Sequence, residues 1–282
     1  MKALVYTNPN EMQLERPYPE AVEGEVVLRI EAVGICGTDL HAYHGHDPRR
    51  KPGLVMGHEF AGTVADGPRT GRRVTGNPLI ACGVCAALAE PAATALHAVN
   101  LSMRALYRPL LECRTLVLGG GAIGLLCALL LRSYGARDVV LTETNPMRRA
   151  SAERHAGCVT FDPRTAAAAS SAFDHVIEAV GAKGTHNAAL QAVKPGGVIL
   201  DICLQDAASE IDMRRLTLAE ITLVGTYGYT TADLRAAVAA LHNNVFGDLA
   251  WVEERRLDDG AAAFADLHHG RTAAAKVVLQ PY

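Results

Sequence analysis

Hydrophobic and polar positions change their rhythm at about residue 115. From Thr115 onward, short apolar runs alternate with longer amphipathic segments, and glycine or proline separates them. Strands that alternate with helices in this way are typical of a parallel, doubly wound α/β sheet. The expected strands are Thr115–Leu118, Asp138–Thr142, His175–Glu178, Val198–Ile202 and Ile221–Val224, and the expected helices are Ile123–Tyr134, Pro146–His155 and Thr231–His242.

The two ends of the chain show a different pattern. Before about Val74, strand-like segments such as Glu25–Ile30 are interrupted by recurring glycines, which is typical of a small β domain. After the expected helix at Thr231–His242 the chain returns to short elements and ends on a strand-like run, Lys276–Leu279. The pattern therefore predicts two domains, and 282 residues are enough for both.

Composition narrows the classes of function. Hydrophobic residues make up 49% of the chain, enough for a sizeable core, but no apolar run reaches the roughly 18 residues that a membrane span needs. A net charge of −3 gives no electrostatic basis for binding nucleic acid or an anionic membrane. Seven scattered cysteines and a strand-like N-terminus favour reduced thiols and no secretory signal. We expect a cytoplasmic protein with neither nucleic acid nor a membrane as a partner.

A glycine-rich turn at residues 119–124 joins the first strand of the α/β region to its first helix. In this context the glycines allow a tight turn, close approach of a pyrophosphate to the backbone, and close packing of helix on strand. Glu143 ends the next strand, where a carboxylate accepts the ribose hydroxyls and repels a 2′-phosphate, so NAD is favoured over NADP. Arg148 lies near enough in the sequence to weaken this preference for NAD, although an arginine at such a position is usually a solvent-exposed helix charge. The expected cofactor-binding residues are Gly119, Gly121, Ala122, Ile123, Gly124, Glu143 and Arg148.

A second group of chemically active residues lies near the N-terminus. Cys36 is followed by Thr38 and His41, and Gly57-His58-Glu59 comes shortly after. Thiolate, imidazole and carboxylate are zinc ligands, and a catalytic zinc site uses three protein ligands and leaves one position open. Glu90 adds a second carboxylate just before the α/β region. A metal that can hold an alcohol oxygen and a fold that can hold a nicotinamide together suggest hydride transfer.

These motifs resemble those of the zinc-dependent medium-chain dehydrogenases, and most closely the polyol, butanediol and threonine dehydrogenase branch. The resemblance rests on Gly34-Ile35-Cys36-Gly37-Thr38-Asp39-Leu40-His41, Gly57-His58-Glu59-Phe60, Glu90-Pro91, Lys194-Pro195-Gly196-Gly197 and Lys276-Val277-Val278-Leu279. It implies a Rossmann NAD-binding domain, residues 96–247, with a doubly wound parallel sheet. That domain would be inserted into a reduced GroES-like β domain, formed by residues 1–95 and 248–282.

The same resemblance implies roles for the site residues. Cys36 and His58 would bind one catalytic zinc ion, and Glu59 and Glu90 would ligate it directly or through water. Thr38 and His41 match the family's proton relay, so the expected catalytic residues are Thr38, His41 and Glu59. Zinc lowers the pKa of a bound alcohol. The unperturbed histidine pKa of about 6.5 suits a group that accepts the proton at the end of the relay.

The chain departs from the family between the β domain and Glu90. Family members with a structural zinc carry four cysteines in a lobe there, whereas this chain has Cys82 and Cys85 alone before Glu90. Two thiolates do not complete a tetrahedral site, so we expect no structural zinc. Residues Ala86–Ala89 must connect the β domain directly to the Glu90 region. The substrate cleft would then lose a wall and discriminate weakly among small alcohols.

We therefore expect an NAD-dependent zinc enzyme that oxidises a secondary alcohol of a polyol, cyclitol or sugar, or reduces the corresponding ketone. Two alternatives stay open. One is a dehydrogenase of an amino-bearing alcohol, such as threonine or an aminocyclitol, and the other is a non-catalytic NAD-binding paralogue. The resemblance also implies a homo-oligomer, a dimer or tetramer, with Ile221–Val224 and Tyr227 near its interface.

Overall fold

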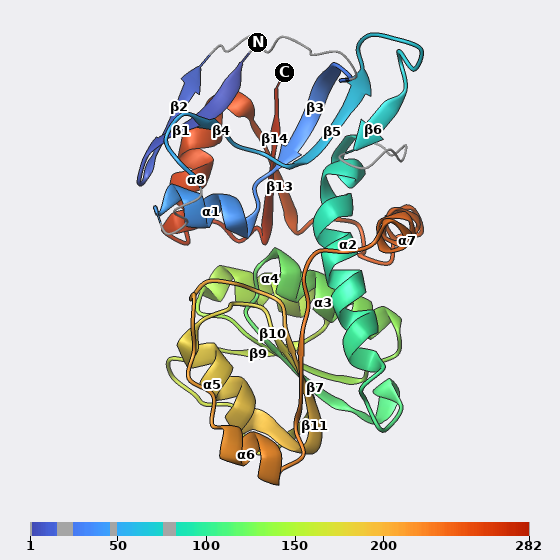
Figure 1. Ribbon diagram of the computed structural model, residues 1–282, viewed down its shortest axis with the longest axis vertical. Helices are drawn as coiled ribbons and strands as arrows, with labels where there is room; N and C mark the ends of the chain where they lie inside the picture. Colours follow the sequence, from blue (N-terminus) through green and yellow to red (C-terminus); the bar gives the residue numbers. More distant parts are fainter. Residues whose placement is uncertain (1, 16–24, 46–49, 76–82, 282) are drawn as a thin grey trace. The chain divides into compact units, whose positions relative to one another are not determined.

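The computed structural model describes residues 2–15, 25–45, 50–75 and 83–281, with side chains in α2 described from residue 87 onward (Figure 1). These residues form two compact units. The first unit comprises Met1–Pro91 and Val252–Tyr282, and the second comprises Ala92–Trp251. The sequence analysis places the two domain boundaries at 95/96 and 247/248, a few residues from these divisions.

The first unit contains two β-sheets. One has three antiparallel strands in the order β2-β1-β4, and the other has five strands in the order β13-β14-β3-β5-β6. Side chains of β1, β14, α1 and α8 share one core, which includes Leu4, Tyr43, Phe264 and Leu279. The elements are β1 Ala3–Asn8, β2 Glu11–Glu15, β3 Leu28–Gly34, α1 Gly37–Tyr43, β4 Leu54–Val55, β5 Glu59–Val64, β6 Arg73–Thr75, β13 Val252–Arg256, η2 Leu257–Asp259, α8 Gly260–His268 and β14 Lys276–Gln280.

The strand expected at Glu25–Ile30 begins and ends later than the sequence suggested. β3 covers Leu28–Gly34, because its antiparallel partner β5 pairs with it from Leu28 opposite Val64 to Gly34 opposite Glu59. Val26 and Val27, which made the earlier residues look strand-like, have exposed side chains. The pairing partner therefore decides the register, and it brings the end of β3 beside the start of β5.

The second unit contains one six-stranded parallel sheet in the order β12-β11-β10-β7-β8-β9. In order along the chain these strands occupy the Rossmann positions 3-2-1-4-5-6, which confirms the predicted fold class. The elements are α2 Gly83–Met103, η1 Leu110–Glu112, β7 Arg114–Leu118, α3 Ala122–Ser133, β8 Asp138–Thr142, α4 Pro146–Ala156, β9 Val159–Phe161, β10 Phe173–Glu178, α5 Lys183–Ala192, β11 Val193–Asp201, α6 Met213–Leu218, β12 Thr222–Gly225 and α7 Thr231–His242. The first of these, α2, begins in the first unit and ends in the second.

Helices pack on this sheet in two groups. α3 and α4 contact each other and the strands β7, β8 and β9, whereas α5 contacts β10 and β11. The sheet core is filled by apolar side chains such as Leu116, Val140, Phe173, Val176 and Ile199. Because all six strands are parallel, their carboxyl ends lie along one edge of the sheet. In open α/β sheets this edge is where ligands bind.

One helix that the sequence analysis does not foresee is α2, which contains Ala86–Ala89, Glu90 and Pro91. Proline inside a helix removes a backbone donor and costs about 3 kcal/mol, so α2 continues through Pro91 at a cost in stability. The run is rich in alanine, the best helix former, and the side chains of Ala87, Ala92, Ala95 and Ala98 are buried. Burial therefore outweighs the cost of Pro91. Among the described helices, none combines the length and apolar character that crossing a lipid bilayer requires.

Candidate functional site

Cys36 stands immediately before the short helix α1. Its backbone N–H donates to Asp39 Oδ2 at 3.0 Å, which ties the first turn of the helix to the cysteine. Thr38 and His41, three residues apart, lie on one face of this helix. Thr38 is exposed, its Oγ1 accepting from Arg50 Nη2 at 3.3 Å, and His41 is partly buried. α1 thus groups the thiol with the two expected relay residues.

His58 and Glu59 stand at the start of β5, which β3 and its neighbours place beside α1. Gly57 precedes them with φ of +111°, a conformation that favours glycine, and a Cβ there would collide with Val33. Glu59 is opposite Gly34 in the β3–β5 pairing, and a Cβ at Gly34 would collide with the Glu59 carboxylate. Both glycines therefore make room for the ligand-bearing segment.

The structure brings Cys36, His58 and Glu59 together. One potential ligand atom from each residue lies within 4.8 Å of the others. A zinc ion has bonds of about 2.0–2.3 Å to sulfur, nitrogen and oxygen, so a single ion can reach all three atoms with small side-chain movements. A thiolate, an imidazole and a carboxylate form a donor set suited to zinc, and the residues present fit the metal.

Asp39 supports His58 from behind this cluster. Its carboxylate is buried, lies 3.4 Å from His58 Nδ1, and accepts from Arg50 Nη1 at 3.0 Å. Hydrogen bonding to Asp39, followed by hydrogen bonding to Cys36, raises the pKa of His58 to about 10. Burial opposes ionisation of Asp39, but its bonds to His58 and the Cys36 backbone and the charge of Arg50 keep its pKa below the ordinary value. A carboxylate behind a metal-binding histidine is the usual arrangement for fixing its ring.

Lys276 on β14 neutralises Glu59. Its ammonium group lies 2.8 Å from Glu59 Oε1 and 2.6 Å from Oε2, and it also donates to the Ile35 carbonyl at 2.9 Å. Both side chains are almost fully buried. Burial disfavours the charge of Lys276, but the nearby Glu59 carboxylate outweighs it and raises the pKa of the lysine. The pair therefore holds the Glu59 carboxylate and the strand before Cys36 in one place.

Glu90, on α2, is electrostatically coupled to the same cluster. Burial, followed by the neighbouring negative charge of Glu59, raises the pKa of Glu90 to about 7. His58 and Lys276 act on Glu90 in the opposite direction. The fourth expected ligand therefore lies in the electrostatic field of His58 and Glu59, and it stands on a helix.

The glycine turn in the second unit has the geometry of a dinucleotide cradle. Gly119 has φ of +99°, and a Cβ at Gly124 would collide with the Gly119 carbonyl oxygen. In contrast, a Cβ at Gly121 would meet nothing within 4 Å. The open space above Gly121, at the start of α3, is where the N-terminal amides of the helix can bind a diphosphate. Ala122 and Ile123 form the first turn of that helix.

Glu143 reaches back to this turn from the end of β8. Its carboxylate accepts from the Gly120 N–H at 3.0 Å and from the Asn145 N–H at 2.8 Å, which fixes its position at the carboxyl edge of the sheet. Arg149 donates to the Glu143 carbonyl at 2.6 Å and serves the backbone. Arg148 differs, because its Nε is buried without a hydrogen-bond partner among the described residues. The open cradle and this unpaired donor fit a dinucleotide.

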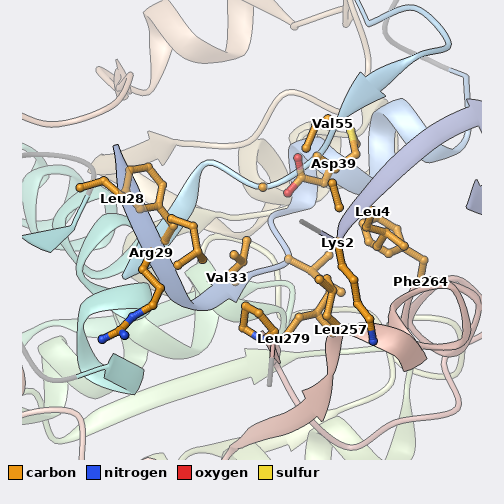
Figure 2. Close-up of a pocket in the computed structure, with 18 residues that line it drawn as sticks. Lys2, Leu4, Leu28, Arg29, Val33, Asp39, Val55, Leu257, Phe264 and Leu279 are labelled. Carbon is orange, nitrogen blue, oxygen red and sulfur yellow. The ribbon is translucent and has the colours of Figure 1, made fainter. Parts of the chain in front are cut away.

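An apolar cavity of about 570 Å³ lies in the first unit, with Asp39 and Gly57 in its lining beside the proposed zinc ligands (Figure 2). Figure 2 shows side chains of Leu4, Val33, Phe264 and Leu279 around it, with the Asp39 carboxylate among them. The prediction that there is no structural zinc rests on Cys82 and Cys85, whose side chains lie outside the described part of the structure.

Three residues that support the site had no role assigned to them from the sequence: Asp39, Arg50 and Lys276. Asp39 carried a usable signal, since an acidic residue three positions after Cys36 suits the first turn of a helix. The motif that begins at Lys276 does not reveal its partner, because Glu59 is more than two hundred residues away in the sequence. All four expected metal ligands belong to the first unit, and all seven expected cofactor residues belong to the second.

Known protein families match both the N-terminal part of the chain and the α/β region that follows it. Residues 22–122 match the family model described as the alcohol dehydrogenase GroES-like domain, and residues 122–243 match the model described as zinc-binding dehydrogenase. An L-threonine 3-dehydrogenase from Streptomyces avermitilis is 30% identical to this chain, with 99% of each protein covered. The chain belongs to the zinc-dependent medium-chain dehydrogenase family.

Solved structures of the family show the same fold. L-idonate 5-dehydrogenase from Escherichia coli superimposes with a TM-score of 0.83 at 23% identity, covering 99% of this chain and 97% of the other. A protein from Sinorhizobium meliloti 1021, described as a putative zinc-binding dehydrogenase bound to NADP, superimposes with a TM-score of 0.81 at 26% identity, covering 99% of both chains. The alignment with the Streptomyces relative runs over 342 positions, although this chain has 282 residues. Because the alignment covers nearly all of both proteins, the residues that this chain lacks relative to the Streptomyces protein are mostly internal ones.

The buried Lys276–Glu59 pair leads to a stability prediction. Lys276→Met should lower the free energy of unfolding by about 3–5 kcal/mol, because it leaves the Glu59 carboxylate buried without a counter-charge. The double variant Lys276→Met/Glu59→Gln should regain much of that loss, since neither charge remains. Urea unfolding followed by circular dichroism, with a chelator present so that metal loss does not contribute, measures both differences.

Lys2→Met is the matched control for this experiment. The Lys2 ammonium pairs with Asp258 at 2.6 Å, but both side chains are more than one-third exposed. An exposed pair contributes about 1 kcal/mol or less, so this variant should stay close to the wild type. Equal losses for Lys2→Met and Lys276→Met would contradict the stabilising role of the buried pair.

Proposed function

We propose that this chain catalyses the NAD-dependent oxidation of a secondary alcohol of a polyol, cyclitol or sugar, or the reverse reduction of the ketone. The observation that carries the proposal is the meeting of Cys36, His58 and Glu59, backed by Glu90, in a chain that also forms a dinucleotide cradle. The family relationship supports this reaction class. The substrate class rests on the motif resemblance and is part of the proposal.

In this proposal Cys36, His58, Glu59 and Glu90 hold the zinc. When bound, zinc supplies a Lewis acid that lowers the pKa of an alcohol. Asp39 keeps the His58 ring directed at the site, and Lys276 keeps the Glu59 carboxylate from adding a full uncompensated charge. Cys36 and His58 then act as the fixed ligands, while Glu59 and Glu90 tune the charge of the site.

The proton released from the alcohol needs a route to water. Thr38 and His41 lie on one face of α1, beside Cys36, so a hydroxyl and an imidazole follow one another away from the ligand. We assign Thr38 the role of passing the proton and His41 that of accepting it, since an imidazole changes charge near neutral pH. Arg50 donates a hydrogen bond to Thr38 Oγ1. The Thr38 hydroxyl therefore acts as an acceptor toward Arg50 and can donate its own proton to a different group.

A second candidate is a dehydrogenase of an amino-bearing alcohol. It is favoured by the Streptomyces avermitilis relative, which is named L-threonine 3-dehydrogenase. Assays of NADH formation with a panel of polyols, cyclitols, sugar alcohols, threonine and aminocyclitols separate the two candidates. Turnover of the amino-bearing alcohols alone would replace the first proposal with the second, and no turnover by zinc-loaded protein would favour the non-catalytic paralogue.

Cys36→Ser should lose one equivalent of zinc per chain and its turnover, because a hydroxyl is a much poorer zinc ligand than a thiolate. It should still bind NADH, since the dinucleotide residues belong to the other unit. Cys158→Ser is the matched control, a buried cysteine of the second unit whose Sγ already contacts a backbone carbonyl. Metal analysis and steady-state kinetics on both variants measure the effect.

A variant of the proposed relay residue His41 should have a smaller effect on turnover than Cys36→Ser. His41→Ala should keep its zinc and lower kcat by about 10²–10⁴-fold, the usual contribution of a positioned acid–base group. Near-normal turnover in Cys36→Ser would overturn the zinc mechanism. Near-normal turnover in His41→Ala would overturn the relay alone.

Two glycine variants test the dinucleotide site. Gly121→Ala should keep the stability of the wild type, because its Cβ meets nothing, but should weaken NADH binding by filling the space assigned to the pyrophosphate. Gly124→Ala should lower the melting temperature, because its Cβ collides with the Gly119 carbonyl. Calorimetric NADH titration and thermal unfolding of both variants distinguish the two roles. Unchanged NADH affinity in Gly121→Ala would contradict the assignment.

The same titration with NADPH tests cofactor choice. The Glu143 carboxylate should repel a 2′-phosphate, so we expect NADPH to bind the wild type about tenfold or more weakly than NADH. The unpaired Nε of Arg148 is the feature that could reverse this order, and the Sinorhizobium meliloti neighbour binds NADP. Tighter binding of NADPH that Arg148→Ala abolishes would reassign the cofactor.

We also propose that the chain forms a homo-oligomer through the edge of the second unit's sheet. β12 is an edge strand, and the exposed apolar side chains Leu218, Leu223 and Tyr227 lie on it or close to it in sequence. An exposed edge strand offers unpaired backbone groups to a second copy. Light scattering should give a dimer or a multiple of it, and a strict monomer would contradict the proposal.

A further inference from the structure

Three side chains that the proposed reaction does not use meet at the carboxyl edge of the second unit's sheet. Glu178 is the last residue of β10, Asp201 is the last residue of β11, and His186 extends from α5. One potential ligand atom from each lies within 4.8 Å of the others. This cluster belongs to the opposite unit from Cys36 and His58, so it is a separate group of potential ligands.

The two carboxylates stand at paired positions. Glu178 and Asp201 are direct partners in the parallel β10–β11 register, an arrangement that is unfavourable for like charges. Glu178 is fully buried, and burial raises its pKa. The two carboxylates carry up to two negative charges, whereas His186 supplies at most one positive charge. The cluster therefore has the charge of a cation site.

His186 forms one long hydrogen bond, to Asp201, and the distances in the cluster leave room for a shared ion. His186 Nε2 is 3.4 Å from Asp201 Oδ1 and 3.7 Å from Glu178 Oε2. A charge-assisted hydrogen bond between such groups is about 2.7–2.9 Å long. Ligands bound at about 2.0–2.2 Å around a tetrahedral ion lie about 3.3–3.6 Å apart. The two printed distances are close to this spacing, and all three atoms lie within 4.8 Å of one another.

The remaining atoms of the cluster are held as in metal sites. His186 Nδ1 lies 2.6 Å from Ser209 Oγ, which leaves Nε2 facing the carboxylates. Glu178 accepts the N–H groups of Gly181 at 2.7 Å and Val180 at 3.2 Å. Metal-binding histidines usually bond through their second nitrogen, and ligating carboxylates are themselves hydrogen-bonded. Asp201, about one-third exposed, leaves an approach from solvent.

We propose that Glu178, His186 and Asp201 bind a divalent transition-metal ion of the zinc type, as a second site in addition to the zinc site around Cys36. One imidazole and two carboxylates are donors that both Zn²⁺ and Mn²⁺ accept. The ion neutralises the paired carboxylates and ties β10, β11 and α5 together at the carboxyl edge of the sheet.

The test uses the full chain with the first site disabled. Cys36→Ser/His58→Ala protein is stripped with a chelator and titrated with Zn²⁺ alone in equilibrium dialysis. We expect one equivalent to bind. Adding His186→Gln should weaken binding by tenfold or more, and Asp201→Asn should do the same without altering side-chain size. Circular dichroism confirms that each variant is folded.

His155→Gln is the matched control, since His155 is a histidine of the same unit with the same exposed fraction of 15% and lies 3.9 Å from Asp248. It should leave Zn²⁺ binding unchanged. Absence of binding in the double variant would show a closed ion-pair cluster and overturn the proposal. Equal losses with His155→Gln and His186→Gln, or no loss with His186→Gln, would also overturn it. Because the first site is disabled throughout, the result does not depend on the proposed catalytic activity.

Discussion

The buried ion pair between Lys276 and Glu59 is the constraint on which the first unit depends. It joins the last strand of the chain to β5, and the same ammonium group holds the Ile35 carbonyl beside Cys36. A buried carboxylate without this lysine would be strongly unfavourable. The pair therefore lets a charged ligand residue sit in an apolar sheet, and it fixes the strand ends from which Cys36 and His58 emerge.

In the second unit, polar groups gather at one edge of a sheet whose core is apolar. Its strands are all parallel, so the residues that end them share one edge. Glu143 at the end of β8 and the turn after β7 form one polar group there, and Glu178 and Asp201 at the ends of β10 and β11 form another. The same topology thus generates the dinucleotide cradle and the second cluster, in the two halves of the sheet.

The alignment with the Streptomyces relative shows that this chain is shorter than that family member, and α2 supplies the connection to Glu90. After β6 the next element that the structure describes is the long alanine-rich helix α2, since residues 76–82 lie outside the described residues. That helix carries Glu90 into the field of Glu59, so the fourth proposed ligand is electrostatically coupled to the cluster. An apolar cavity of about 570 Å³ lies in the same unit, with Asp39 and Gly57 in its lining.

The sequence by itself determined the features that depend on neighbouring residues. The alternation of apolar runs and amphipathic segments predicted every strand of the parallel sheet except the short β9, and Asp138–Thr142 and Thr231–His242 match β8 and α7 residue for residue. The glycine turn, Cys36, His58 and Glu59 could be found because each motif is local. The tertiary structure decided what depends on distant residues: the shifted register of β3, the helix around Pro91, and the contacts of Lys276 with Glu59 and of His186 with Asp201. Periodicity along a chain reports which face of an element is buried, whereas the pairing of particular residues follows from strand register and crossover geometry, which no short stretch of sequence contains.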